Sequence, residues 1–503
     1  MTAKVLPRIA TCSGARDALV STANEQVAAQ LEPVEFGAAR DGTHARSEGS
    51  ARIFSILSQK FMNLIRRTLT KMSSTLSAKS AQRLDYLDKS GTVFAEMTAL
   101  ANKHKAVNLG QGFPTLPVPQ FIRNAAVEAV SNECMTHQYT RSEGHPRLVQ
   151  ALSKFYADKI GCTLNPMTQI VTTVGATEAI YTTMQALLSP GDEVILMQPF
   201  YDSYPAAIRL SGGVPVVVDL APPADRPALT SGDWKLDMDT LRAAVTPKTK
   251  ALFINNPHNP VGKVWTREEM MQVAAIAEEF DLIVIADEVY ETLVFTDSPE
   301  KMIKFASLPG MFKRTITLGS IGKMFGVTGW KIGWCLGPED LIRSVWMIHQ
   351  FNVFSVVTPL QEAAAISLEH AMESNFFVET SKTYQQHRDR LIKVLSQAGL
   401  TPTLPHGGYF VMADTTSLEG VLPSASDANE SRRDFRACRF MTTEMGVTAI
   451  PPSAFYERKE GAGGLVPGKH ARFAFCKSLD LINAAGERFD VYSKSHKAKK
   501  QKI

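Results

Sequence analysis

Four short apolar runs, each followed by polar or small residues, constrain the fold of this chain more than any other feature. The runs are Gln169–Val174, Glu193–Met197, Ala251–Ile254 and Asp281–Ala286. Apolar strands of this length are typical of parallel sheets, in which both faces are buried. A helical pattern over 178–188 follows the first run directly. We therefore expect an α/β fold, with a mostly parallel sheet flanked by helices.

The residues that follow these runs are the first candidates for a functional site, because open α/β sheets bind ligands at the carboxyl ends of their strands. Asp287 and Tyr290 come after the fourth run, and Tyr201 follows the second. Asn259 follows the third run after an Asn-Pro step and lies 28 residues before Asp287, as two successive strand–helix units would give. Taken alone, each residue has a purely structural alternative: Asp287 and Asn259 could lie in turns, and Tyr201 could be an aromatic residue of the core.

A small-residue turn, Gly175-Ala176-Thr177, joins the first run to its helix. A strand, a turn and a helix start leave backbone N–H groups unpaired and aimed at an anion, so Ala176 and Thr177 could bind a phosphate. Neither the Walker lysine pattern nor the dinucleotide glycine fingerprint is present here. A purely structural helix start is the alternative.

The segment Ser320-Ile321-Gly322-Lys323 precedes a second lysine, Lys331, by eight residues, and both lie among glycines. A lysine forms an imine with an aldehyde only as the neutral amine, so its pKa must be lowered by burial and nearby positive charge. Lys331 could supply that charge. A solvated connector with two lysines is the alternative interpretation.

In their order along the chain, these segments resemble the class I aminotransferases, pyridoxal-phosphate enzymes of fold type I. The resemblance covers roughly residues 85–490 and ends with Arg472 in Ala471–Phe475. It is greatest for the kynurenine, glutamine-phenylpyruvate and methionine aminotransferase group, through 107–114, 138–146 and 259–263. The fold implied has a large domain that binds the cofactor and a smaller α/β domain.

The resemblance implies a role for each candidate. Lys323 would hold pyridoxal 5′-phosphate covalently and later move the substrate α-proton. Asp287 would hold the pyridine nitrogen, Asn259 and Tyr290 the phenolate oxygen, and Tyr201 would stack on the ring. The cofactor's phosphate would be bound by Ala176, Thr177, Ser320 and Lys331.

Substrate recognition is implied in the same way. Arg472 would grip the substrate α-carboxylate in a bidentate contact, assisted by Gly112 and Asn259. Tyr139 would reach the phosphate of a partner subunit, which implies a homodimer with shared active sites. Two departures are Lys331, where many class I members carry arginine, and Phe94, where some kynurenine-processing relatives carry tryptophan.

The implied reaction is a ping-pong transamination in which an amino acid gives its α-amino group to a 2-oxo acid. Dicarboxylate-specific relatives commonly have a second arginine, but the segment 350–359 contains no basic residue. Its aromatics, with Phe94, Phe113 and Tyr139, predict an apolar pocket for large neutral donors such as methionine, glutamine, phenylalanine or kynurenine. Core phenylalanines are the alternative interpretation.

Three other functions are alternatives to transamination. A cysteine S-conjugate β-lyase would expel a leaving group from the same substrate carbanion. A non-catalytic regulator would need a DNA-binding module, and the N-terminal extension has no helix-turn-helix pattern. An inactive scaffold would need none of Lys323, Asp287, Asn259, Tyr290 and Arg472.

Composition excludes several other classes. The chain has 503 residues, of which 44% are hydrophobic, and a net charge of only +4, so nucleic-acid binding is not expected. The six cysteines have no metal-site or disulfide spacing, which predicts a reducing compartment and no metal. No apolar run approaches the roughly 20 residues that span a bilayer.

The expected organisation has four parts. Residues 1–83 would be a mostly disordered extension, 84–117 and 376–492 a small domain, 118–375 the large cofactor-binding domain, and 493–503 a disordered basic tail. Within the extension, 62–80 is basic, rich in Ser and Thr and free of acidic residues. It reads either as a mitochondrial targeting segment that starts at Met62 or as a basic linker, so the protein would be mitochondrial or cytoplasmic.

Overall fold

The computed structural model describes residues 84, 92–132, 135–428, 430–457 and 468–500, all within the unit that spans residues 81–503. The expected N-terminal extension and its basic segment lie outside the described residues. Among the described helices, none is long and apolar enough to cross a membrane.

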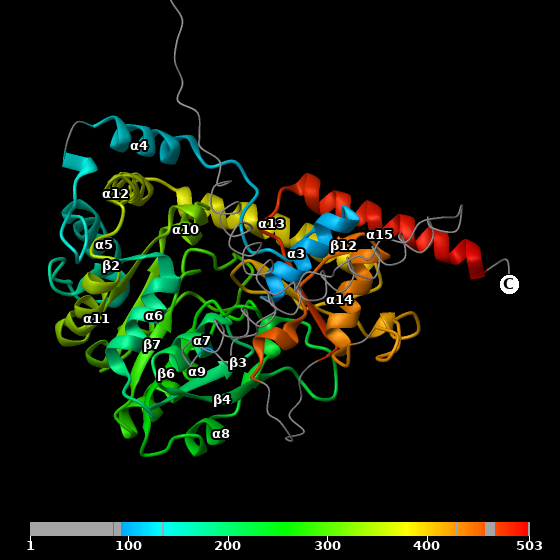
Figure 1. Cartoon of the computed structure of the whole chain (residues 1–503), viewed down its shortest axis with the longest axis horizontal. Helices are drawn as coiled ribbons and strands as arrows, with labels where there is room; N and C mark the ends of the chain where they lie inside the picture. The colour runs from blue at the N-terminus through cyan, green and yellow to red at the C-terminus, as the bar shows by residue number, and fades with distance from the viewer. Residues whose placement is uncertain (1–83, 85–91, 133–134, 429, 458–467, 501–503) are drawn as a thin grey trace, which may run out of the picture. The chain divides into compact units, whose positions relative to one another are not determined.

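An eight-stranded mixed sheet forms the centre of the large part of the fold, with helices on both sides (Figure 1). Its order is β2-β9-β8-β7-β6-β3-β4-β5, and the five neighbours from β8 to β4 run parallel. Strand β9 runs antiparallel to both of its neighbours. The strands are β2 Ile170–Val174, β3 Glu193–Gln198, β4 Val214–Ala221, β5 Lys235–Leu236, β6 Thr249–Asn255, β7 Ile283–Asp287, β8 Thr315–Ser320 and β9 Ile332–Leu336. The expected mostly parallel α/β sheet is confirmed.

The apolar runs form strands because successive side chains enter cores on opposite faces of the sheet. In β3, Val194 lies in the core under α6 (Gly175–Leu187), α7 (Ser203–Leu210) and α11 (Glu339–Asn352). Ile195 enters the opposite core. The helices of that opposite side are α5 Pro146–Ile160, α8 Met238–Ala243, α9 Arg267–Glu279 and α12 Thr358–Met372.

The remaining elements of the large part are two helices and several short 3₁₀ helices. Helix α4 (Gln120–Ser131) packs on α12, and the one-turn helix α10 (Ile321–Met324) follows β8. Short 3₁₀ helices fill several connections, namely η2 Met135–His137, η3 Ser231–Asp233, η4 Phe305–Ser307, η5 Phe312–Arg314 and η6 Thr328–Trp330.

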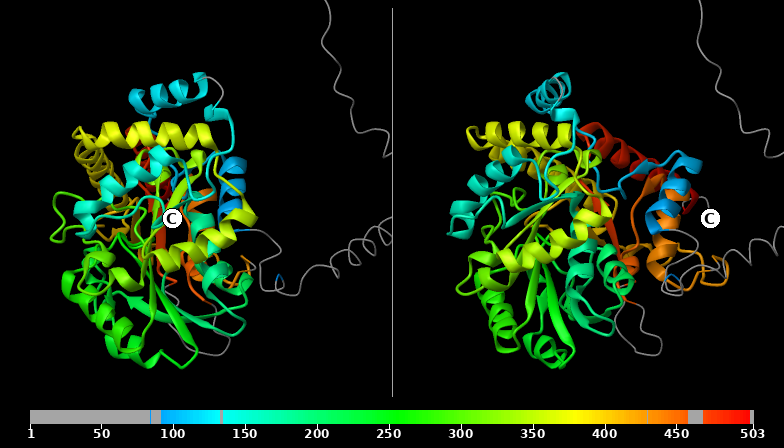
Figure 2. Two further views of the ribbon diagram at one scale, coloured as in Figure 1. Left: turned by 90° about the vertical axis from the view of Figure 1, so that its left-hand side faces the viewer. Right: turned by 60° about the vertical axis from the view of Figure 1, so that its left-hand side comes forward.

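A second, smaller group of elements carries Arg472. Its three-stranded antiparallel sheet is formed by β10 Thr401–Pro402, β11 Phe410–Asp414 and β13 His470–Ala474. The parallel pair β1 Val107–Asn108 and β12 Val447–Thr448 lies in the same apolar core. The helices are α3 Val93–His104, α13 Phe376–Gln397, α14 Arg433–Thr443 and α15 Leu479–Lys500, with η7 Thr416–Leu418 and η8 Pro452–Phe455 (Figure 2). The predicted domain limits stay a prediction.

The C-terminal end differs from the expected disordered tail, because α15 continues to Lys500. Its first half is anchored by Ile482, Ala485 and Phe489, which are at most 1% exposed. Once a helix is nucleated by such packing, each further residue adds a hydrogen bond without a new nucleation cost, and alanine and lysine favour it. Residues 493–500 are thus helical where the charge pattern predicted disorder, and residues 501–503 lie outside the described residues.

Candidate active site

The polar residues predicted at the strand ends meet at one edge of the large sheet. Asn255, the last residue of β6, is in register with Asp287, the last residue of β7. Asp287 is in register with Leu318 of β8, two residues before Ser320. The side chain of Asn255 binds the Asp287 carbonyl oxygen through Nδ2 at 2.8 Å and accepts from the Asn259 N–H at 2.6 Å.

A cavity of about 410 Å³ opens at this edge. It brings together all the predicted site residues except Tyr139, namely Gly112, Ala176, Thr177, Tyr201, Asn259, Asp287, Tyr290, Ser320, Lys323, Lys331 and Arg472. Residues from four strand ends, the α6 N-terminus and the smaller sheet thus line one space. Among the described residues, no group of acidic, histidine and cysteine side chains is arranged to hold a metal ion.

Lys323 lies on α10, directly after β8. Its Nζ donates to the Gly112 carbonyl oxygen at 3.3 Å and lies 5.5 Å from the ring centroids of both Tyr290 and Tyr409. Burial lowers the pKa of the Lys323 amine, and the positive charges of Arg472 and Lys331 lower it further. Nearby Cys476 and Asp287 oppose this shift. The amine is therefore more readily neutral, and so more nucleophilic, than a lysine in water.

Asp287 is 4% exposed and has two polar contacts. The Tyr204 hydroxyl donates to Oδ2, and the Val289 N–H donates to Oδ1 at 3.3 Å. Burial raises the pKa of Asp287, while the Tyr204 hydrogen bond and the charge of Lys323 oppose the shift. A cationic N–H placed beside Asp287 would stabilise its ionised form.

The N-terminus of α6 forms a cradle for an anion. The helix has no side-chain cap, and Ala176 and Thr177 lie in its first turn, where N–H groups lack intrahelical partners. Gly333 is required beside it, because a Cβ there would lie 2.6 Å from the Gly175 carbonyl carbon. Lys331 reaches the same turn, with Nζ 3.2 Å from where a Cβ of Gly175 would be. A phosphate fits these donors and charges.

Arg472 projects from β13 and is 2% exposed. It donates to the Gly110 carbonyl oxygen at 3.0 Å and to Asn259 Oδ1 at 3.3 Å, while its buried Nε has no hydrogen-bond partner. Its guanidinium carbon lies 4.0 Å from the ring centroid of Phe410 and 4.8 Å from that of Phe455. Burial lowers the pKa of Arg472 to about 10. An incoming carboxylate would satisfy both the charge and the free N–H.

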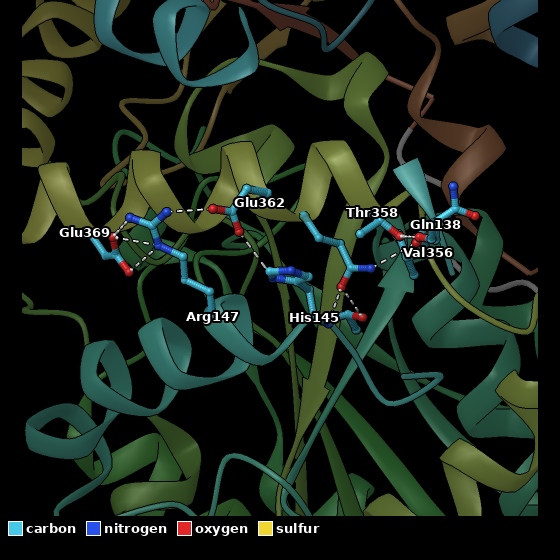
Figure 3. A network of polar contacts seen from close by, with 9 residues as sticks. Gln138, His145, Arg147, Val356, Thr358, Glu362 and Glu369 are labelled. Carbon is cyan, nitrogen blue, oxygen red and sulfur yellow. Dashed lines mark hydrogen bonds and ion pairs between the residues drawn. The ribbon is translucent and has the colours of Figure 1, made fainter. Parts of the chain in front are cut away.

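Tyr139 does not line the cavity of its own chain. It is 83% exposed and packs edge-on against Phe354, with ring centroids 5.1 Å apart. The backbone before it is held by Thr358, whose hydroxyl donates to the Gln138 carbonyl oxygen at 2.7 Å (Figure 3). The segment 350–359 does not line this cavity either, and Phe351 is 89% exposed. Of the residues expected to form an apolar pocket, Phe94 and Phe113 line the cavity of their own chain, whereas Tyr139 and the segment 350–359 do not.

The segment around Tyr139 is tied to the rest of the fold by the polar network in Figure 3. Gln361 of α12 accepts from the His145 N–H and from the Thr172 hydroxyl, each at 2.9 Å. Arg147 binds Glu362 at 2.6 Å and Glu369 at 2.7 Å. Since Gln361 is fully buried, these contacts fix the path of the chain from 138 to 147 against α12.

Several site residues were missed from the sequence. Tyr204 binds Asp287, and its position three residues after Tyr201 on the same aromatic segment was the available signal. Asn255 holds Asn259, although only Asn259 was predicted to act. Phe410 lies against Gly112, where a Cβ would come within 2.6 Å of its ring, and nothing local to residue 410 indicates this contact.

The arrangement suits one class of chemistry. A single cavity is lined by an amine with a lowered pKa, an anion cradle, a buried carboxylate and a guanidinium whose Nε–H has no hydrogen-bond partner. A flat cofactor with an aldehyde and a phosphate could be held between the amine and the cradle. A substrate carboxylate could then bind Arg472, with its α-carbon near Lys323.

Comparison with known proteins agrees with this geometry. The family described as aminotransferase class I and II matches residues 104–469. A kynurenine–oxoglutarate transaminase of Dictyostelium discoideum is 42% identical over 82% of this chain and 96% of its own length. Kynurenine–oxoglutarate transaminase 1 of Homo sapiens is 38% identical over 81% of this chain and 97% of its own length. The solved structure of a methionine aminotransferase from Escherichia coli has a TM-score of 0.71 and 31% identity, and covers 82% of this chain and 98% of its own.

Proposed function

The chain belongs to the class I and II aminotransferases, and on this basis we propose that it binds pyridoxal 5′-phosphate in the cavity described above. The enzyme is a transaminase. Its donors would be large neutral or aromatic amino acids of the kynurenine and methionine class, and its acceptor a 2-oxo acid. The transfer would follow ping-pong kinetics, because one cavity serves donor and acceptor in turn.

One observation carries the proposal: Lys323, Asp287 and Arg472 line a single cavity and are matched to different atoms of the reactants. The free Nε–H of Arg472 supports carboxylate recognition, because a buried N–H donor without a partner is costly unless a ligand supplies an acceptor. The lowered pKa of Lys323 supports covalent attachment.

Each side chain would have a defined task. Pyridoxal phosphate, when bound, supplies an electron sink for charge at the substrate α-carbon. Lys323 would hold it covalently and then move the α-proton, and Asp287 would keep a proton on the ring nitrogen. Asn259 and Tyr290 would bind the phenolate oxygen, Tyr201 would cover the ring, and the phosphate would be bound by Ala176, Thr177, Ser320 and Lys331.

The lining of the cavity supports a neutral donor side chain. Arg472 is the only arginine among the described lining residues, so a second, distal carboxylate would find no equivalent partner. Phe94, Phe113 and Phe410 supply apolar surface. Relatives named for kynurenine and for methionine support the same donor class.

A homodimer would complete the site. Tyr139, Phe351, Phe354 and Val357 are between 51% and 89% exposed and come from neighbouring segments. Exposed apolar groups of this size are typical of protein–protein contacts. We infer that a second copy covers them and that Tyr139 of each chain reaches the phosphate in the partner's cavity.

An absorbance spectrum tests the cofactor and the donor class together. Purified protein supplied with pyridoxal phosphate should acquire a visible band that bleaches on addition of kynurenine, phenylalanine or methionine and returns with a 2-oxo acid. Aspartate should bleach it much less, because no second arginine lines the cavity among the described residues. Faster bleaching by aspartate than by all neutral donors would contradict the donor class. Pyruvate release without an acceptor would instead reveal β-lyase activity.

Mixing two inactive variants tests the shared site. Lys323→Ala and Tyr139→Ala homodimers should each have low activity, for different reasons. After unfolding and refolding together, half of the dimers are heterodimers with one intact site, so activity should recover to about one quarter of the wild-type value. Recovery should fail when each variant is refolded alone. No recovery in the mixture would contradict the contribution of Tyr139 across the dimer.

A further inference from the structure

Three cationic side chains bind backbone carbonyl oxygens of the segment 110–113, of which Gln111, Gly112 and Phe113 line the cavity. Arg472 binds the Gly110 carbonyl oxygen at 3.0 Å, and Lys323 binds that of Gly112 at 3.3 Å. Lys477 binds the carbonyl oxygen of Phe113 at 2.8 Å. The first two cations belong to the site already described. Lys477 has no role in that site, although it lies five residues after Arg472.

Lys477 is an unusual side chain for its surroundings. It is 1% exposed, and within the described part of the chain it forms no ion pair. Burial lowers the pKa of its amine, and nearby Cys476 opposes the shift. Burying an ammonium without a carboxylate is costly, so an apolar residue would serve stability as well or better. The contacts of Lys477 therefore point to a role other than stability.

The hydrogen bond and the cation–π contact described for the Lys477 side chain are both with Phe113. Besides the carbonyl hydrogen bond, Nζ lies 3.9 Å from the Phe113 ring centroid, a cation–π distance. Phe113 is 49% exposed and lines the cavity. The lysine thus fixes both the backbone and the ring of a residue at the edge of the site.

The neighbouring backbone gives Lys477 a rigid base. The Thr115 N–H donates to the Cys476 carbonyl oxygen at 3.1 Å, and the Ser478 N–H donates to the Thr115 hydroxyl at 2.8 Å. These bonds join the two segments directly beside the Lys477–Phe113 contact. Lys323 can bind Gly112 only while its amine is free, whereas the contact of Lys477 does not depend on that amine.

We propose that Lys477 is a specificity-determining positioning residue, which holds Phe113 against the side chain of large apolar donors. The inference builds on the transaminase function proposed above and names the element that selects its donors. The side chain of a small donor such as alanine would be too short to reach Phe113, so the rate with alanine should not depend on where Phe113 lies. Aromatic donors such as phenylalanine should depend on it.

The test is the variant Lys477→Met, which keeps the length of the buried stem and removes both contacts. The ratio of kcat/KM for phenylalanine to that for alanine should fall about tenfold, mainly through KM, as expected for losing a charge-assisted hydrogen bond and a cation–π contact. Cofactor absorbance and melting temperature should stay at wild-type values. Lys477→Arg, which keeps a cation with donors, should restore much of the ratio.

Lys159 provides a matched control. Its Nζ binds the carbonyl oxygen of Phe155 at 2.7 Å and lies 3.6 Å from that ring, but neither residue lines the cavity. Lys159→Met removes the same pair of contacts and should leave the donor ratio unchanged. An equal change of the ratio in both variants would overturn the proposal, because the effect would then be general.

A double-mutant cycle with Phe113→Leu separates positioning from a general structural effect. If Lys477 acts through Phe113, the double variant should have the same donor ratio as Phe113→Leu alone. The inference would be overturned if the two substitutions lowered the donor ratio independently, so that their effects multiplied in the double variant. It would also be overturned if Lys477→Met left the ratio unchanged. A wild-type spectrum that fails to respond to any amino acid would contradict the proposed function itself, so the two failures are distinguishable.

Discussion

Replacing Lys323 by alanine is expected to lower the transamination rate by about 10⁴-fold or more, because one amine would provide both the covalent attachment and the proton transfer. The substitution leaves the cavity otherwise intact, since the only hydrogen bond described for Nζ is with the Gly112 carbonyl oxygen. Single-turnover conversion of donor to oxo acid, with pyridoxal phosphate in excess, measures the loss. Cofactor should still bind non-covalently at the anion cradle.

Lys313→Ala is the control for this substitution. Its side chain is 63% exposed and lies outside the cavity, so activity should be unchanged. The pH dependence gives a second check on Lys323. Because burial lowers the pKa of its amine, capture of the cofactor aldehyde should rise with pH and reach its midpoint below the usual lysine range. Turnover by Lys323→Ala at the parent rate would contradict the proposed site.

Replacing Arg472 by methionine is expected to lower kcat/KM for all amino donors by about 10²–10³-fold, since every donor carries the α-carboxylate. The loss of kcat/KM is expected to be large because the variant would lack a charge-assisted, bidentate contact with the carboxylate inside a buried site. The variant Arg472→Lys should recover little of this loss, because an ammonium lacks the planar fork. Steady-state kinetics with phenylalanine and alanine would measure the change, and both donors should lose affinity equally.

The stability of the Arg472→Met variant distinguishes binding from folding. Methionine would lose the hydrogen bonds from Arg472 to Gly110 and Asn259, but it would also remove a buried cation that has no ion pair among the described residues, so the two effects on the unfolding free energy should largely cancel. Arg388 is the matched control, because it is equally buried but binds Asp297 and lies outside the cavity. Arg388→Met should cost about 1–3 kcal/mol of unfolding free energy without changing the donor KM. The reverse pattern would contradict the assignment of Arg472 to the substrate.

Much of the candidate site followed from local patterns in the sequence. Asp287 and Asn255 end neighbouring parallel strands, so their meeting at one edge is a consequence of strand direction. The turn at Gly175 follows the first predicted strand directly, and Ser320, Lys323 and Lys331 lie in one short glycine-rich stretch, although the strand before Ser320 was not predicted. Such features were recognisable because each depends on residues within about ten positions of one another.

Contacts between distant segments were not recognisable in this way. Phe113 and Lys477 are 364 positions apart, and Gly110 and Arg472 are 362 apart, yet each pair is joined by a hydrogen bond. The sequence around 350–359 indicated an apolar pocket, but packing turns those aromatics outward from their own cavity. The helix to Lys500 also depends on packing of its first half against the core.

The sequence by itself determined the α/β class and the family, and it supplied Lys323, Asp287 and Arg472 as the candidates for a reactive lysine, a carboxylate and an arginine. The α/β class follows from short-range periodicity, whereas the family and the role of each candidate residue are implied by the resemblance of motifs in their order along the chain. Only the tertiary structure decided which partner each of these groups has, that Tyr204 holds Asp287 and that Lys477 holds Phe113. The physical reason is that a hydrogen bond is set by distance in space, whereas sequence patterns report only the geometry of neighbouring residues.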